Sequence, residues 1–369
     1  MQLVDTVEQR ELRAAVRRFL TDRTPPRTTG APAGSGPGFD RVTWKRLATE
    51  LGLPAIGIPE RLGGAGYGAV EQTIVLEELG RALYPGPYLA SAVLAAGTLL
   101  LAGDGTAARR YLPAIASGER IGTLALPQPR TAEGETPPVA TRTDQGWLVS
   151  GRHGFVLDGR NADLVLVAAR TSAGSSLFAV EATAAGLTAR ALPAVDQTRQ
   201  VAELELREVP AVEVGAPGAA DRILSAVLDR AGIALAAEAL GGADAALEMM
   251  VGYAKTRRQF GRPIGSFQAV KHRCADVYTE IESSRAAVRY GAWAVASSSE
   301  EVPLLAPLIK AYATDTFYHA ASANIQIHGG IGFTWEHDAH LYFKRATFNR
   351  LFLGDPAHHR QQLAARIGL

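Results

Sequence analysis

The spacing of apolar positions divides the chain into three parts. Residues 1–120 carry apolar side chains at intervals of three and four, as in QRELRAAVRRFLTDR, RVTWKRLATELGL and EQTIVLEELGRAL. This spacing places the apolar side chains on one face of a helix. Residues 121–215 instead consist of short strand-forming runs, such as GWLVSGRHGFVL and ADLVLVAART, separated by Gly, Pro and Asp. Such runs predict a small β-sandwich or barrel.

Helical spacing returns in residues 216–369. It persists from residue 223 to residue 258, which is about ten turns. Gly241 and Gly242 interrupt this segment, and a helix tolerates them where another helix packs closely. Two more long helices are expected over 267–297 and 303–330. The predicted fold is α+β, with a helical domain (1–120), a middle β domain (121–215) and a C-terminal four-helix-type bundle (216–369).

The composition narrows the class of protein. Hydrophobic residues make up 47% of the chain and charged residues 20%, and the net charge is +1. This balance is typical of a globular protein and offers no basic face for nucleic acid. A single cysteine, Cys274, excludes a disulfide framework. The N-terminus has an amphipathic pattern, and no apolar run approaches the roughly 20 residues of a membrane span. We therefore expect a cytoplasmic protein.

Two segments in the C-terminal part carry candidate binding residues. In YAKTRRQFGRPIGSFQ, Arg257 lies in the last turn of a helix beside a tight turn. A guanidinium there suits a pyrophosphate, although helix capping and solvation also explain it. In QIHGGIGFTWEHDAHLYFKRA, the glycines at 329 and 330 let a ligand approach the backbone.

The second segment also contains three histidines, at 328, 337 and 340. They raise the question of a metal site. No supporting carboxylate pair is evident beside them, and histidines on a polar helix face are common. We predict no metal site.

These two segments, together with GIPERLGGAGYG near the N-terminus, resemble the acyl-CoA dehydrogenase family of flavoproteins. The resemblance covers nearly the whole chain. It implies FAD in a cleft between the β domain and the helical bundle, with its ADP half completed by a neighbouring subunit. By similarity, Arg257 would reach the pyrophosphate and Phe260 would pack beside it. The remaining ADP-half contacts would come from Gln268, Gln326, Gly329 and Gly330.

The resemblance implies a reaction that needs a carboxylate base, and this chain has no such residue at the family's positions. In the family a carboxylate takes the α proton of an acyl-CoA while a hydride leaves the β carbon for flavin N5. A positioned base of this kind contributes roughly 10²–10⁴-fold in rate. The usual position of the family's Glu falls 23 residues after Gly330, at Leu353, and the alternative position on the long helix falls at Ala231. Neither side chain takes a proton.

Contacts that the family makes with the flavin ring have also changed. The family's Thr-Glu-Pro and Gly-Ser-Asp stretches correspond to Pro127-Gln128-Pro129 and RTAEG here. Its Trp-x-Thr pair corresponds to Phe155 and Leu157, and Leu157 has no hydroxyl. The Thr-Ser-Gln that follows the usual Glu is replaced by Asp355, Pro356 and Ala357.

A neighbouring residue could replace the missing base. The fallback candidate is Asp355, followed by Glu238, Asp229 and His358, and each also fits an ordinary turn or helix-surface role. We interpret His358 and His359 as solvated residues at the start of a helix.

The pattern of loss predicts a partner subunit, because the contacts to the ADP half are kept while those to the ring and substrate are gone. The chain resembles the base-less subunits of actinobacterial heterotetrameric acyl-CoA dehydrogenases of steroid side-chain degradation. The resemblance implies a homologous catalytic chain as partner, an acyl-CoA as substrate and electron-transfer flavoprotein as a possible acceptor. The alternatives are a self-sufficient dehydrogenase that uses Asp355, a flavin oxidase or hydroxylase, and a structural subunit.

Overall fold

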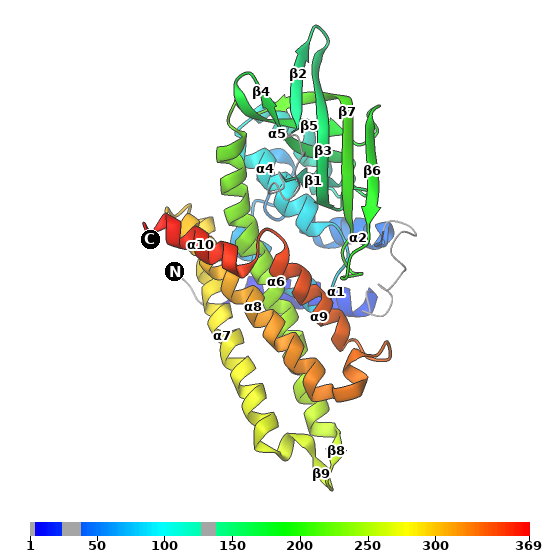
Figure 1. Ribbon diagram of the computed structural model, residues 1–369, viewed down its shortest axis with the longest axis vertical. Helices are drawn as coiled ribbons and strands as arrows, with labels where there is room; N and C mark the ends of the chain where they lie inside the picture. Colours follow the sequence, from blue (N-terminus) through cyan, green and yellow to red (C-terminus); the bar gives the residue numbers. More distant parts are fainter. Residues whose placement is uncertain (1–3, 24–37, 127–137) are drawn as a thin grey trace.

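The computed structural model describes residues 4–23, 38–126 and 138–369. Helices and strands are arranged in three parts along the long axis of the molecule (Figure 1). The β sheet occupies one end, the helices of the N-terminal part lie beside it, and the long C-terminal helices extend to the other end. This agrees with the predicted order of a helical part, a β part and a helical part.

The N-terminal part is built from short amphipathic helices. Asp40 caps one of them by accepting hydrogen bonds from the backbone amides of Val42 and Thr43. The segment after α3 begins as a π-helix and continues as α4. The helices are α1 (Val7–Arg23), α2 (Arg41–Leu51), α3 (Ala69–Arg81), the π-helix (Leu89–Ala95), α4 (Ala96–Leu101) and α5 (Gly105–Ala116), with 3-10 turns at Leu53–Ala55 and Glu60–Leu62.

The middle part is a seven-stranded sheet that closes on itself. Strand β4 pairs with β5 on one side and with β2 on the other, and the path β4-β2-β3-β7-β5 returns to β4. Strand β1 adds to β4 in parallel, and β6 adds to β7 in antiparallel. The strands are β1 (Gly122–Ala125), β2 (Val139–Thr143), β3 (Gly146–Leu157), β4 (Leu164–Thr171), β5 (Gly174–Glu181), β6 (Leu187–Leu192) and β7 (Val201–Val214).

The C-terminal part is dominated by one very long helix. Helix α6 (Ala220–Thr256) packs against α3 on one side and α8 on another. A two-stranded hairpin, β8 (Arg258–Gln259) and β9 (Arg262–Pro263), joins it to α7 at the end of the molecule farthest from the sheet (Figure 1). The remaining elements are the 3-10 turns Ile264–Ser266 and Gly329–Phe333 and the helices α7 (Gln268–Ala296), α8 (Val302–His328), α9 (Ala339–Leu351) and α10 (Pro356–Arg366).

The two adjacent glycines in α6 mark its closest helix contacts. A Cβ atom at Gly241 would lie 1.8 Å from the carbonyl oxygen of Glu77 on α3. A Cβ atom at Gly242 would lie 2.3 Å from the ring of Phe317 on α8. Since neither position has room for a methyl group, the glycines allow both neighbouring helices to pack directly on the α6 backbone. The condition under which a long helix tolerates this pair, a closely packed neighbouring helix, is therefore met.

Buried charges join the β part to the long helices. The side chains of Arg199 and Asp196, in the loop before β7, are fully enclosed together with Glu238 of α6 and Arg345 of α9. Arg345 donates to Asp196 at 2.8 Å and to Glu238 at 2.9 Å, and Arg199 also donates to Glu238. Two guanidiniums and two carboxylates thus neutralise each other, which buried charges require.

Candidate functional site

A large cavity lies where the loop before β7, the start of α6 and the α9–α10 segment meet. Its volume is about 1040 Å³, at the upper end of the range for small-molecule sites. Leu353 and Gly232 both line it, so it includes the usual position of the family's base and the neighbour of Ala231, the alternative one. Ala231 itself is fully buried. This cavity is therefore the candidate functional site that the chain itself forms between its β part and its helical bundle.

The turn between α9 and α10 is held rigidly at one wall of this cavity. Leu353 has a φ of 62°, in the left-handed region that few non-glycine residues occupy. The buried amine of Lys310 on α8 donates to the carbonyl oxygen of Arg350 at 3.1 Å and to that of Gly354. Burial lowers the pKa of Lys310 to about 7, although the charge of Asp355 opposes the shift. The lysine therefore fixes the backbone on both sides of Leu353.

His359 holds the same turn from the other side, and our interpretation of it as a solvated residue is wrong. Its side chain is only 8% exposed. Its Nε2 lies 2.9 Å from the carbonyl oxygen of Leu353 and donates a hydrogen bond to that oxygen. Burial lowers the pKa of His359 to about 4, so the ring is neutral near pH 7. Its neighbour His358 is exposed and lines the cavity.

The proposed replacement bases already have hydrogen-bonding or ion-pair partners. Asp355 is the N-cap of α10 and accepts a hydrogen bond from the backbone amide of His358 at 2.8 Å, although it also lines the cavity. Asp229 lines the cavity and forms an ion pair with Arg366 at 2.9 Å. Burial raises the pKa of Asp229, and Arg366 acts against that shift. These carboxylates therefore have structural roles in addition to their exposure to the cavity.

Glu238 lies outside the cavity lining. Burial alone would raise its pKa, but the charges of Arg199 and Arg345 and the hydrogen bonds from Arg199 and Asn349 outweigh it and lower the pKa. A carboxylate held between two guanidiniums is a poor proton acceptor. The structure therefore gives Glu238 a role in the buried charge cluster.

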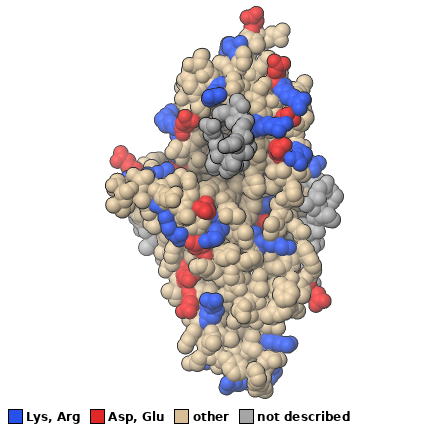
Figure 2. Space-filling view, viewed as in Figure 1, with Lys and Arg blue, Asp and Glu red and all other residues tan. Residues whose placement is uncertain are grey.

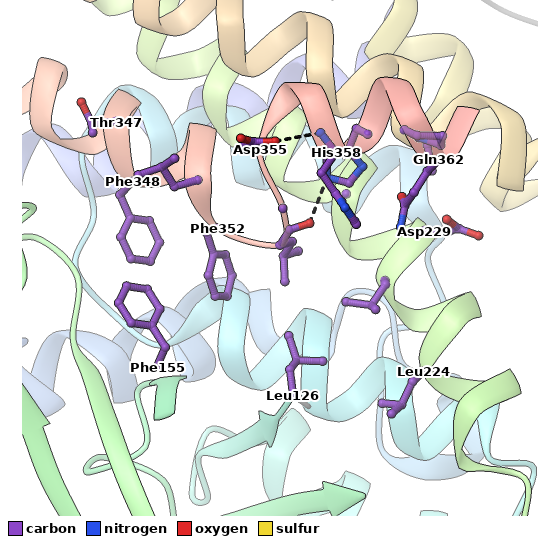
Figure 3. Close-up of a pocket in the computed structure, with 18 of the residues that line it drawn as sticks. Leu126, Phe155, Leu224, Asp229, Thr347, Phe348, Phe352, Asp355, His358 and Gln362 are labelled. Carbon is purple, nitrogen blue, oxygen red and sulfur yellow. Dashed lines mark hydrogen bonds between the residues drawn. The ribbon is translucent and has the colours of Figure 1, made fainter. Parts of the chain in front are cut away.

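Aromatic side chains form the opposite wall of the cavity from the polar residues of α10 (Figure 3). Phe155 of β3 stacks on Phe348 of α9 with ring centroids 6.3 Å apart, and Phe348 stacks on Phe352 at 5.2 Å. Leu157, the other residue at the expected ring contact, is 1% exposed and points into the core instead. The remaining expected ring-contact positions, Pro127, Gln128, Pro129 and the RTAEG segment, lie outside the described residues.

The residues predicted to contact the ADP half lie at the far end of the bundle. Arg257 ends α6 and is exposed, and the Phe260 side chain after it is 90% exposed. Gln268 begins α7 and is exposed as well. In Figure 2 this end of the molecule carries Lys and Arg side chains. An exposed guanidinium and an exposed aromatic ring at one tip are suited to a flavin that reaches them from outside.

The two binding motifs meet at this end. Tyr253, one turn before Arg257, stacks on His328 with ring centroids 4.3 Å apart, and His328 directly precedes the glycine pair. Gly329 has φ 61° and ψ −139°, which only glycine adopts readily. A Cβ atom at Gly329 or Gly330 would have no atom within 4 Å, so space is open for a ligand against the backbone.

Gln326 and nearby histidines also lie at this end of the bundle. Gln326 is exposed on the last turn of α8. The rings of His328 and His337 are 4.1 Å apart, and His340 packs edge-on against Trp335. Within residues 4–23, 38–126 and 138–369, no group of three His, Cys, Asp or Glu side chains is placed to hold a metal ion.

Several structurally important residues were not predicted from the sequence. Lys310 is one of only five lysines and lies in an otherwise apolar helical stretch, which is the signal that could have marked it as a buried, partnered amine. Asp196, Arg199 and Arg345 carry no comparable signal. Their partners lie 39 to 149 residues away along the chain, so no local pattern links them.

The order of a helical part, a closed β part and a helical bundle is that of the acyl-CoA dehydrogenase fold. The sequence matches the acyl-CoA dehydrogenase N-terminal domain over residues 6–119 and the C-terminal domain over residues 221–368. The chain belongs to this family of oxidoreductases. Among the described helices, none is long and apolar enough to cross a membrane.

The chain is also similar to individual proteins and solved structures. The chain is 35% identical to the acyl-CoA dehydrogenase IpdE2 of Mycobacterium tuberculosis, over 98% of this chain and 97% of that protein. It resembles a chain of the ChsE4-ChsE5 complex of the same organism, with a TM-score of 0.89 and 30% identity over 100% and 99% of the two chains. It also resembles the Tcur3481-Tcur3483 steroid acyl-CoA dehydrogenase, with a TM-score of 0.87 and 32% identity over 98% and 97%.

Proposed function

We propose that this chain is the non-catalytic subunit of a heteromeric FAD-dependent acyl-CoA dehydrogenase. In this assembly a homologous chain holds the flavin ring and supplies the base. The observation that carries the proposal is the pair of apolar residues, Leu353 and Ala231, at the two positions where the family places its glutamate. The FAD would accept the hydride when the acyl-CoA is desaturated, and electron-transfer flavoprotein is the expected acceptor of the electrons.

The distance along α6 supports the sharing of FAD between chains. Arg257 caps the C-terminal end of the helix that contains Ala231, and 257 minus 231 gives 26 residues. At 1.5 Å per residue this corresponds to about 39 Å. That separation exceeds the reach between the pyrophosphate and the ring of one FAD molecule. Arg257 therefore serves the FAD whose ring lies in another chain.

The residues present fit the ADP half of FAD better than its ring. The tip of the α6–α7 hairpin offers an exposed guanidinium, an exposed aromatic ring and open space beside Gly329 and Gly330. The cleft offers phenylalanine rings, and Leu157 is turned into the core. This chain thus offers suitable contacts to the ADP half of FAD, whereas its cleft offers apolar side chains to the flavin ring.

The related complexes give independent support. The solved ChsE4-ChsE5 structure is described as a complex, and the Tcur3481-Tcur3483 protein as a steroid acyl-CoA dehydrogenase. By analogy we propose an acyl-CoA with a steroid-derived acyl group as the substrate of the assembly.

The test is co-expression of the chain with a homologous chain that carries the family's glutamate. We expect the pair to co-purify with FAD and desaturate an acyl-CoA, and the isolated chain to hold little FAD. The variant Arg257→Gln should lower the FAD content of the pair. An isolated chain that is yellow and fully active would overturn the proposal.

A self-sufficient dehydrogenase is the second candidate, because Asp355 and Asp229 both line the cavity. The variant Asp355→Asn separates the two proposals. If Asp355 is the base, turnover falls by roughly 10²-fold or more while FAD remains bound. If the partner supplies the base, turnover of the complex stays within a few-fold of the original value.

A further inference from the structure

The N-terminal half of helix α8 presents apolar side chains to the surface. The helix packs against α6, α7, α9 and α10, yet the side chains of Leu304, Leu308 and Tyr312 are 39%, 50% and 41% exposed. Their spacing of four residues places them on one face of the helix. A helix face that meets water ordinarily carries charged or polar residues. Three large apolar side chains in this place therefore indicate a surface that another molecule covers.

The residues that follow α10 widen this surface. Ile367 is 54% exposed and Leu369 is 89% exposed. Both follow Arg366 of α10, whose guanidinium donates to the carbonyl oxygen of Pro303, the residue before Leu304. The apolar surface therefore continues from the start of α8 onto the end of α10. We call it the α8 patch, and its members are Leu304, Leu308, Tyr312, Ile367 and Leu369.

This part of α8 carries no exposed charge. The structure describes every residue of α8, and from residue 302 to residue 312 the one charged side chain is that of Lys310, which is fully buried. The next charge is that of Asp315, which forms ion pairs with Arg350 at 2.8 Å and with Arg360 at 2.7 Å. A molecule that covers the α8 patch therefore meets an uncharged, apolar surface, and apolar side chains are its complement.

The same face of α8 leads to Gln326, one of the residues proposed to contact the partner's FAD. At about 100° per residue, Gln326 falls within the arc of about 80° that Leu304 and Tyr312 span. It lies 22 residues beyond Leu304 (326 minus 304), or about 33 Å along the helix. The chain whose FAD receives Gln326 therefore lies against this side of α8. A second copy would instead bring Gln326 to a cleft lined with phenylalanine rings.

We propose that the α8 patch is the surface on which the homologous, glutamate-carrying chain docks. The inference rests on the proposed function, which supplies that chain, and it adds the surface through which the two chains associate. Leu304, Leu308 and Tyr312 form a ridge along the helix, and such a ridge packs into the groove of a helix on the facing chain. The α8 patch thus holds the two chains together, while Gln326 and Arg257 contact the cofactor.

Charge substitutions at Leu308 test this surface. Leu308→Glu and Leu308→Arg each place an unpaired charge in the apolar interface, so both should raise the Kd of the heteromer roughly a hundredfold or more. Val42→Glu is the matched control, because Val42 is 67% exposed on α2 and lies outside the α8 patch, and it should leave the Kd unchanged. Sedimentation velocity on mixtures of the two purified chains with added FAD measures the Kd.

Circular dichroism and thermal unfolding of each variant chain alone protect the test against misfolding. Because the Leu308 side chain is half exposed, its variants should fold as the wild type does. If they do not, Tyr312→Ser replaces them, since it removes apolar area without adding a charge and should raise the Kd roughly tenfold. An unchanged Kd in the folded variants overturns the proposal, as does tighter association with either charge. Self-association of the chain that Leu308→Glu abolishes, with an unchanged heteromer, assigns the surface to a second copy and also overturns it.

These outcomes are distinguishable from those of the proposed function. Arg257→Gln should assemble with the partner and hold less FAD, whereas Leu308→Glu should fail to assemble. An active, FAD-containing heteromer that tolerates Leu308→Glu removes only this inference. Failure of the wild-type chain to associate with the glutamate-carrying chain removes the proposed function, and this inference with it.

Discussion

The buried charge cluster makes Glu238→Gln the most informative stability variant. Glu238 and Asp196 balance Arg199 and Arg345, so the substitution leaves one carboxylate for two enclosed guanidiniums. Removing one partner of a buried ion pair typically costs 3–5 kcal/mol. The amide of Gln still accepts a hydrogen bond, so we expect a loss of about 3 kcal/mol in the free energy of unfolding.

Urea denaturation followed by circular dichroism at fixed protein concentration measures this loss. Glu248→Gln is the matched control, because Glu248 lies on the same helix, is mostly exposed and pairs with Arg81. Exposed pairs contribute about 0–1 kcal/mol. The pKa of Glu238 lies below its usual value of 4.5. The difference in unfolding free energy between wild type and Glu238→Gln should therefore shrink as the pH falls through this lowered pKa. A loss equal to that of Glu248→Gln would refute the reasoning.

Three further predictions use single substitutions elsewhere. Gly241→Ala should destabilise the chain by about 1–3 kcal/mol, because its Cβ meets the α3 backbone. Gly252→Ala on the same helix has open space around its Cβ and should stabilise the chain by up to about 1 kcal/mol. Thermal unfolding compares the two variants, and equal effects would contradict the packing argument. Burial lowers the pKa of Lys310 to about 7 from 10.5, so between these pH values the unfolded state binds more protons than the folded state. The stability of the wild type relative to Lys310→Met should therefore rise with pH across this window, by up to a few kcal/mol. A difference in urea midpoint that does not change with pH would contradict this prediction. Arg257→Gln should reduce the FAD content of the purified heteromer, whereas Lys255→Gln, two residues earlier on the exposed end of α6, should not. Flavin absorbance after denaturation measures both, and equal retention of FAD in both variants would remove Arg257 from the site.

The sequence predicted the parts of the fold that depend on local patterns. Apolar spacing located the long helices, and short strand-forming runs located the β part. Close helix packing was the condition for tolerating the adjacent glycines of α6, and the Cβ contacts at Gly241 and Gly242 meet it. The assignment of the chain to its family rested on two long motifs in the C-terminal part. These features share one property, which is that the deciding residues lie close together in the sequence.

The parts of the site that depend on tertiary contacts could not be predicted. His359 was interpreted as a solvated residue because it follows a Gly-Asp-Pro turn, yet α10 packs its ring against the backbone of Leu353. Glu238 was a candidate base only while its two arginine partners, from distant segments, were unknown. The tertiary partners of His359 and Glu238 thus became visible only in three dimensions.

The central claim is that this chain completes the FAD site of a partner and does not supply the base. Counting FAD in the purified chain, alone and co-expressed with a homologous glutamate-carrying chain, tests it most directly. The account predicts little FAD in the chain alone, and in the pair an amount of FAD that follows the number of glutamate-carrying chains. A full complement of FAD together with acyl-CoA desaturation in the chain alone would contradict it.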